Sequence, residues 1–195
     1  MKKKILILAV VAMCAAILAS GTLAYFTAED EVHNIITSDA VDIQIEEWQQ
    51  TDEGLVSYPK EEPISVMPGV AVSKIVTIKN MEAKAYIRAK FEVIITKEDG
   101  SIMELSPEML ASIITLTMNG EDWLRQDGDG EWWYYNAPVP TGESTEAFFT
   151  EVVFDGPNMT NEYQNCTVEV IVTAQGVQTA NNGASALEAA GWSAE

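Results

Sequence analysis

The sequence has very few of the residues from which catalytic and metal sites are usually built. Its 195 residues include one histidine, His33, and two cysteines, Cys14 and Cys166. A Ser-His-Asp triad, a His-Glu-x-x-His zinc motif and a ready Cys-His pair are therefore missing. No glycine-rich phosphate loop precedes a helical pattern either. The composition predicts a protein that is not an enzyme.

Basic residues are also scarce. Lys and Arg together number 11 against 30 Asp and Glu, which gives a formal net charge of −19 at pH 7. A field of this sign repels the phosphates of nucleic acids and anionic membrane surfaces, and it keeps an exported protein in solution. We therefore expect no nucleic-acid partner, and contact with a membrane only through the N-terminal segment.

That N-terminal segment has the pattern of a secretory signal. Lys2 to Lys4 precede an uncharged, apolar run over residues 5–20. Thr22 and Ala24 supply small residues for a signal peptidase, so we expect cleavage between Ala24 and Tyr25 and a secreted protein. Loss of the three lysines would change the net charge from −19 to −22. An uncleaved anchor is the alternative, because the apolar run approaches the roughly 20 residues that span a bilayer.

Export would leave Cys166 as the only cysteine of the mature chain. An intramolecular disulfide is then impossible, so stability must come from a hydrophobic core. About 170 mature residues make one domain the default expectation.

Alternating apolar and polar residues predict that this domain is built from strands. The clearest alternation covers residues 85–95 and indicates a long strand with one face in the core and the other in water. Weaker alternation marks residues 41–45, 72–79, 148–154 and 166–174. Turn signals such as Asn119-Gly120 separate these segments, which favours an all-β, antiparallel sandwich of the jelly-roll type.

One short helix is expected to interrupt the strands. Ser106 has the residue type of an N-cap, and Pro107 and Glu108 suit the first helical turn. The pattern predicts one or two helical turns that lead into a strand over residues 114–118.

An aromatic hairpin surrounds an acidic turn. Asp127, Asp129 and Glu131 alternate as in the front of a calcium loop, but the distal bidentate glutamate of such a loop is missing. We therefore expect these carboxylates to belong to a polar hairpin tip. We expect no cofactor, with calcium at this turn as the alternative.

The flanking aromatic residues should divide between two faces of the hairpin. We expect Trp123 beside Trp132 and Tyr134, with Trp133 and Tyr135 on the opposite face. One face must pack in the core. The face of Trp133 and Tyr135 could pack as well, contact another subunit or stack on a carbohydrate.

Four stretches carry a resemblance to a known family: "GTLAYFT", "NIITSDAVDIQI", the "MPG" turn before "KIVTIKN", and "EYQNCTVEVIVTAQGVQTANN". Together they resemble the TasA/camelysin (CalY) family, whose members are exported with a SipW-dependent signal peptide. The resemblance implies a jelly-roll domain, release by a SipW-type signal peptidase, and assembly into extracellular biofilm-matrix fibres of Gram-positive bacteria. Some relatives carry a metallopeptidase label, which this sequence does not support.

The resemblance also implies that the new N-terminal segment of one subunit adds as a strand to the next. Residues 25–36 would form this arm, and its apolar side chains are Tyr25, Phe26, Val32, Ile35 and Ile36. The segment 28–31, with three acidic residues, suits a buried strand poorly, so we expect 32–36 to insert while Tyr25 and Phe26 hold a surface. In the alternative, 32–36 folds back as the first strand of its own domain and the protein stays a monomer.

The expected organisation is therefore a signal peptide over 1–24, an arm over 25–36, a β-sandwich over 37–181 and an Ala-rich tail over 182–195. The tail should be a mobile end or a short helix with Trp192 docked. We expect a homopolymeric matrix subunit, with an accessory matrix protein as a candidate partner, in the extracellular matrix or at the cell surface. A monomeric adhesin or carbohydrate-binding module is the main alternative, and a secreted metallopeptidase is the third.

Overall fold

The computed structural model describes residues 27–31, 34–36, 41–59, 64–65, 68–126, 128, 130–163 and 165–192, of which 27–31, 34–36 and 64–65 are described by their backbone only. The described strands are β1 (Thr27–Glu31), β2 (Asn34–Ile36), β3 (Ile43–Thr51), β4 (Gly54–Ser57), β5 (Ile64–Ser65), β6 (Ala71–Ser73), β7 (Ile75–Asn80), β8 (Ala85–Thr96), β9 (Ile114–Met118), β10 (Trp123–Arg125), β11 (Trp133–Tyr135), β12 (Phe149–Phe154) and β13 (Thr167–Gln178). The helical elements are α2 (Pro107–Ile113) and the 3₁₀ turns η1 (Asn161–Tyr163) and η2 (Ala186–Glu188).

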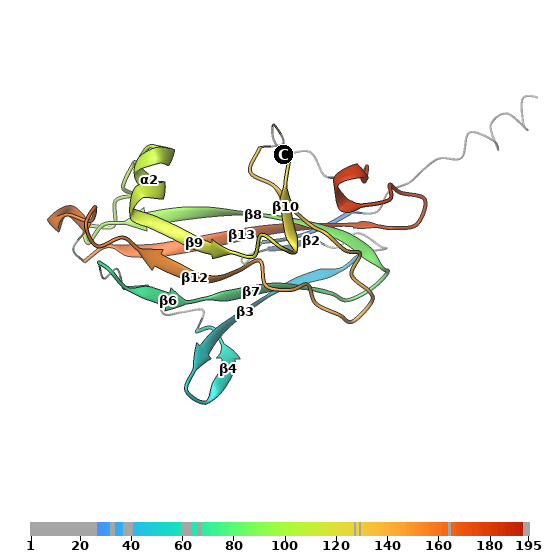
Figure 1. The fold of residues 1–195 in the computed structure, drawn as a ribbon, viewed down its shortest axis with the longest axis horizontal. Coiled ribbons are helices and arrows are strands. Elements are labelled where there is room, and N and C mark those ends of the chain that lie inside the picture. Colours follow the sequence, from blue (N-terminus) through green and yellow to red (C-terminus); the bar gives the residue numbers. More distant parts are fainter. Residues whose placement is uncertain are drawn as a thin grey trace, which may run out of the picture.

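These strands form three antiparallel sheets. The largest has the order β10-β11-β8-β13-β1-β2, with β5 paired to the other end of β13; the smaller ones are β6-β12-β9 and β4-β3-β7. In Figure 1, β8 and β13 run along the molecule above β6, β7 and β3, while the β3–β4 hairpin projects downward. The predicted all-β, antiparallel sandwich is confirmed. Its jelly-roll connectivity stays a prediction.

The main core lies between the large sheet and the two smaller ones. It joins alternate residues of the facing strands, which is the arrangement that a period of two produces in a sandwich. Its fully buried members include Ile43 and Ile45 of β3, Val76 and Ile78 of β7, Ile87 of β8, Val152 and Phe154 of β12, and Val172 of β13. Phe148, which precedes β12, packs against Phe91, Trp123 and Phe149 with ring centroids 4.7–6.2 Å apart.

The long strand predicted at 85–95 is confirmed as β8, but the prediction that one of its faces is wet is wrong for its first half. Tyr86 and Arg88 belong to the outward set, yet they are only 6% and 7% exposed. The C-terminal segment and the β11 region cover them, because Trp132, Ala186 and Trp192 form a second apolar cluster over this face. The alternation of apolar and polar residues within a strand does not show that a segment far along the chain will pack over its polar face.

The predicted helix and the strand after it are confirmed. Ser106 caps α2, and its hydroxyl accepts a hydrogen bond from the backbone N–H of Met109 at 3.3 Å. Pro107 occupies the first turn, where its missing N–H costs nothing. The chain then continues as β9 from Ile114, so α2 is an insertion before an edge strand of the smaller sheet.

The single strand predicted over 72–79 is wrong. The chain passes from β6 to β7 at Lys74 and thereby changes sheets, since β6 pairs with β12 whereas β7 pairs with β3. Nζ of Lys74 lies 2.7 Å from Oε1 of Glu47, and both side chains are at least nine-tenths buried. The ammonium also lies 4.1 Å from the ring centroid of Tyr58. Among the described residues no well-aligned hydrogen bond reaches this carboxylate oxygen, so Lys74 is the partner that compensates its charge.

We predict that Lys74→Met lowers the free energy of unfolding by about 3–5 kcal/mol, because it leaves a buried carboxylate without its cation. Urea denaturation followed by tryptophan fluorescence measures this loss. The double variant Lys74→Met/Glu47→Leu should recover most of the stability, because an apolar pair of similar volume replaces both charges. Equal stability of the single and double variants would contradict the assigned pairing.

Candidate strand-addition edge and its aromatic face

The N-terminal arm completes one edge of the large sheet. β1 pairs with β13 antiparallel, from Thr27 opposite Val177 to Glu31 opposite Thr173, and β2 in turn pairs with β1. The other end of β13 pairs with β5. The main chain of β13 over 173–177 is therefore bonded to β8 on one side and to the arm on the other.

This arrangement differs from the expected use of the arm. The acidic stretch over 27–31 is the part that lies beside β13, whereas Ile35 and Ile36 lie in β2, one strand further out. In the single chain the arm thus folds onto its own sheet, as in the monomeric alternative, but through residues that we expected to stay outside. Ala24, Tyr25, Phe26 and Val32 lie outside the described residues.

Val41 and Ile43 of the facing layer approach β13 closely at Gly176. This glycine stands opposite Ala28 of the arm. A Cβ atom at position 176 would lie 2.8 Å from Cγ1 of Val41 and 3.1 Å from Cγ2 of Ile43. Only a residue without a side chain fits here without displacing these core side chains. β13 is therefore held closely against the core at the position where it pairs with the arm.

On the outer face of the same sheet, Arg88 lies in an aromatic cage. Its guanidinium carbon is 4.1 Å from the ring centroid of Trp132 and 4.8 Å from that of Trp192. Nε and Nη2 donate to Oε1 of Gln175 at 2.9 and 2.7 Å, and Nη1 donates to the Tyr134 hydroxyl at 3.3 Å. Stacking and hydrogen bonds together allow a guanidinium to be buried.

The C-terminal segment closes this cage. The amide group of Asn182 bonds both backbone groups of Ala190, at 2.8 and 3.1 Å, and so forms a loop around η2. The Tyr86 hydroxyl donates to the carbonyl of Gly183 at 3.0 Å, and Trp192 packs edge-on against Tyr134. Of the two expectations for the tail, the structure has a short helical turn with Trp192 docked. We did not predict the cage. The available signal was an arginine flanked by Ile87 and Ala89 in the first half of a long strand.

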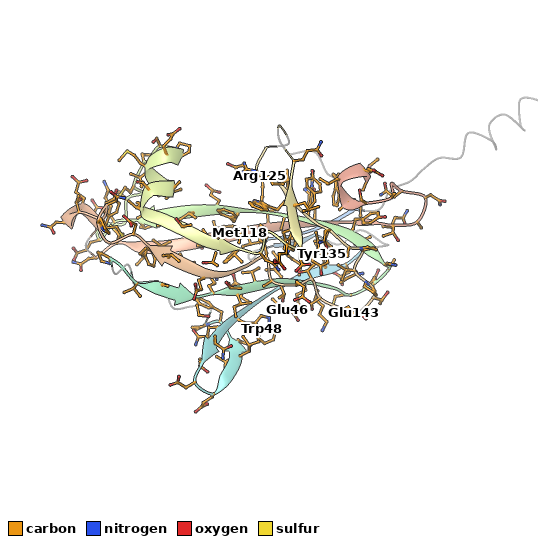
Figure 2. All side chains as sticks on the ribbon, viewed as in Figure 1. Glu46, Trp48, Met118, Arg125, Tyr135 and Glu143 are labelled. Atoms are coloured by element: carbon orange, nitrogen blue, oxygen red, sulfur yellow. The ribbon has the colours of Figure 1, made fainter. Side chains whose placement is uncertain are left out.

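The expected division of the aromatic hairpin is wrong for Trp123. Because Trp123 pairs with Tyr135, it packs in the main core with Tyr135 and Trp133, whereas Trp132 and Tyr134 belong to the outer cluster. Trp123 is 1% exposed, and its indole N–H donates to the carbonyl of Glu146. Figure 2 shows Arg125 and Tyr135 at opposite ends of the hairpin, with Tyr135 toward the lower layer.

Trp133 and Tyr135, the candidates for an aromatic contact surface, are both half-buried. Trp133 packs edge-on against Phe148, and Tyr135 lies 5.2 Å from Trp123 between ring centroids. The Tyr135 hydroxyl accepts a hydrogen bond from the backbone N–H of Glu146. Their larger contacts are therefore with the main core.

Of the three candidate ligands in the acidic turn, only Glu131 belongs to the described residues. Glu131 is exposed, while Asp127 and Asp129 lie outside the described residues, as does His33. Within the part of the chain that is described, no group of three or more His, Cys, Asp or Glu side chains could hold a metal ion. In that same part, no helix is long and apolar enough to span a membrane.

Comparisons with protein-family models, with curated proteins and with solved structures gave no match. The resemblance to the TasA/camelysin family therefore rests on the sequence stretches quoted above, and the functional hypothesis rests on those stretches and on the geometry of the β13 edge.

Cys166 is a buried thiol immediately before β13. It is 4% exposed, and its sulfur lies 3.6 Å from the carbonyl oxygen of Glu162. Burial raises the pKa of the thiol, and Asp99 adds to this rise while Lys97 opposes it. Because the thiolate is the reactive form, both the raised pKa and the shielding slow its chemistry.

We predict that Cys166 reacts with Ellman's reagent at pH 8 at least about tenfold more slowly in the folded protein than in urea. Stopped-flow absorbance on the mature chain measures both rates, and free cysteine supplies the reference. A folded-state rate equal to that in urea would show that the thiol is accessible.

Proposed function

We propose that this protein is a secreted structural subunit that polymerises into extracellular matrix fibres by adding its N-terminal arm to the β13 edge of another copy. A SipW-type signal peptidase releases the arm by cleaving between Ala24 and Tyr25. The protein then acts in the extracellular matrix or at the cell surface, without catalysing a reaction.

The pairing of β1 with β13 is the observation that carries this proposal. Five consecutive residues of the arm pair with the edge of β13, at the end of the chain that export would set free. An edge strand supplied from a terminus can be exchanged between identical subunits, because the main-chain hydrogen bonds are the same within a chain and between chains. The acceptor edge is therefore already matched to this arm.

Exchange of the arm also accounts for growth into a fibre. Each copy donates at its N-terminus and accepts at β13, so the contact is heterologous and does not close on itself. Before cleavage, the arm is joined to the signal segment and is restrained at the membrane. Cleavage makes the donor available outside the cell, which prevents assembly before export.

The adhesin alternative receives less support. Carbohydrate binding needs an exposed aromatic platform, whereas Trp133 and Tyr135 direct their main contacts to Phe148 and Trp123. The metallopeptidase alternative has one histidine in the whole sequence from which to build a zinc site.

We predict that the chain over residues 25–195 forms filaments and that a chain starting at Thr37 does not. Negative-stain electron microscopy of both, at mildly acidic and neutral pH, makes the comparison. Circular dichroism must show that the shorter chain keeps its β signal, because loss of an edge strand can also destabilise a sheet. Filaments from the shorter folded chain would exclude the arm as the donor.

A disulfide lock tests exchange without removing the arm. Glu31 and Thr173 stand directly opposite each other, at a Cα separation that suits a disulfide. In a Cys166→Ala background, Glu31→Cys/Thr173→Cys should close within one chain on oxidation and prevent filaments. Reductant should restore them.

The matched control for the lock is Glu31→Cys in the same background, which removes the same carboxylate but cannot close a bridge within the chain. It should assemble with and without oxidant, although more slowly than the unchanged chain, because it lacks one carboxylate of the arm and because disulfide-linked dimers form. Filaments from fully locked monomers, verified by mass spectrometry, would refute arm exchange.

A further inference from the structure

The acidic positions of the arm are in register with the two basic residues of β8. One row of paired residues crosses four strands: Glu29 of β1 pairs with Gln175 of β13, Gln175 pairs with Arg88 of β8, and Arg88 pairs with Tyr134 of β11. Two positions along, Glu31 stands opposite Thr173, which stands opposite Lys90. Residues in register across antiparallel strands share one face of the sheet. Two acidic positions and two basic residues are thus aligned on the outer face, with the same spacing.

The guanidinium of Arg88 is bonded to both strands that flank β8. Nε and Nη2 donate to Oε1 of Gln175 on β13, the strand next to the arm, and Nη1 donates to the Tyr134 hydroxyl on β11. The main chain of the arm lies one strand spacing, about 4.8 Å, beyond the main chain of β13. Trp132 and Trp192 both pack against the guanidinium and so restrict its position.

The environment makes this cation a strong attractor of carboxylates. Arg88 is 7% exposed, and ion pairs with a buried guanidinium are screened less than pairs at the surface. The half-buried Lys90 lies beside it, with Nζ 5.0 Å from the ring centroid of Trp132. The chain has 11 basic and 30 acidic residues. Arg88 and Lys90 therefore form a positively charged site on a protein of strongly negative net charge.

We propose that Arg88 and Lys90 form a recognition site for the carboxylates of Glu29 and Glu31 on an N-terminal arm, and that a second copy of this chain supplies this arm in the fibre. This inference rests on the proposed function for its fibre part. The acidic residues, rather than the apolar residues of the arm, then select its register. A slip by one residue would place Asp30 in line with Arg88 and move both glutamates to the opposite face. A slip by two would leave one of the two cations without its acidic position.

The first test uses the monomer, so it does not depend on fibre formation. Glu29→Gln/Glu31→Gln should lower the hydrogen-exchange protection of the amides over 173–177 by about tenfold, because two charge-assisted contacts are lost. Asp30→Asn is the matched control, since it removes one negative charge at a position on the other face; its protection should change less than threefold. Equal losses in the double variant and the control would overturn the inference.

The second test asks whether the recognition acts between copies. Lys90→Glu and Glu31→Lys each place like charges in line at the site, so either variant alone should elongate at least about tenfold more slowly than the unchanged chain. A mixture of the two restores opposite charges at every contact between unlike copies and should elongate faster than either alone. Light scattering and electron microscopy measure the rates. A mixture no faster than its components would refute the recognition between copies.

The two tests separate failure of this inference from failure of the proposed function. If the unchanged chain forms no filaments, the proposed function fails, and the exchange experiment still decides whether Arg88 and Lys90 recognise the arm. If filaments form and the charge variants behave like the unchanged chain, the proposed function stands and the recognition site is refuted.

Discussion

The pairing of β8 with β13 is the interaction on which the rest of the structure depends. Twelve consecutive residue pairs join these strands without a bulge, from Ala85 opposite Gln178 to Thr96 opposite Thr167. A one-residue slip would turn one of the two strands over relative to the other. If β8 turned over, Arg88 would enter the main core and Ile87 would leave it; if β13 turned over, the same would happen to Gln175 and Gly176. This register fixes the inner core, the outer cage and the alignment of the arm at once.

Burial of both faces follows from that central position. The inner face packs against β3, β7 and β12, while the outer face near Arg88 is covered by Trp132 and by the C-terminal segment. A buried arginine costs free energy unless its charge is solvated by other groups. Here Gln175, Tyr134 and two indole rings provide those contacts. The C-terminal segment is thus a structural part of the sheet that accepts the arm.

The sequence predicted correctly those elements that are determined by neighbouring residues. The capped helix at Ser106 and the strand of β8 follow from residue types within a few positions of each other. The change of sheet at Lys74 could not be predicted, because an unbroken alternation hides a position at which the chain passes from one sheet to another. The cage around Arg88 also escaped prediction, because it joins residues 132, 175 and 192, which no local period connects. The side of Trp123 depends on hairpin register, and the loop residues left that register open.

Because the chain is strongly negative, the proposed assembly depends on a local attractive contact such as the basic pair Arg88 and Lys90 on β8. Subunits of this charge repel one another at long range, so general attraction cannot bring an arm to its acceptor edge. In the proposed assembly, two cations in line with two acidic positions of the arm would attract it only at short range, within a Debye length of about 8 Å at physiological ionic strength. Repulsion between the bodies and attraction at one aligned site together favour a single, directional contact, which is the geometric requirement for a fibre rather than an aggregate.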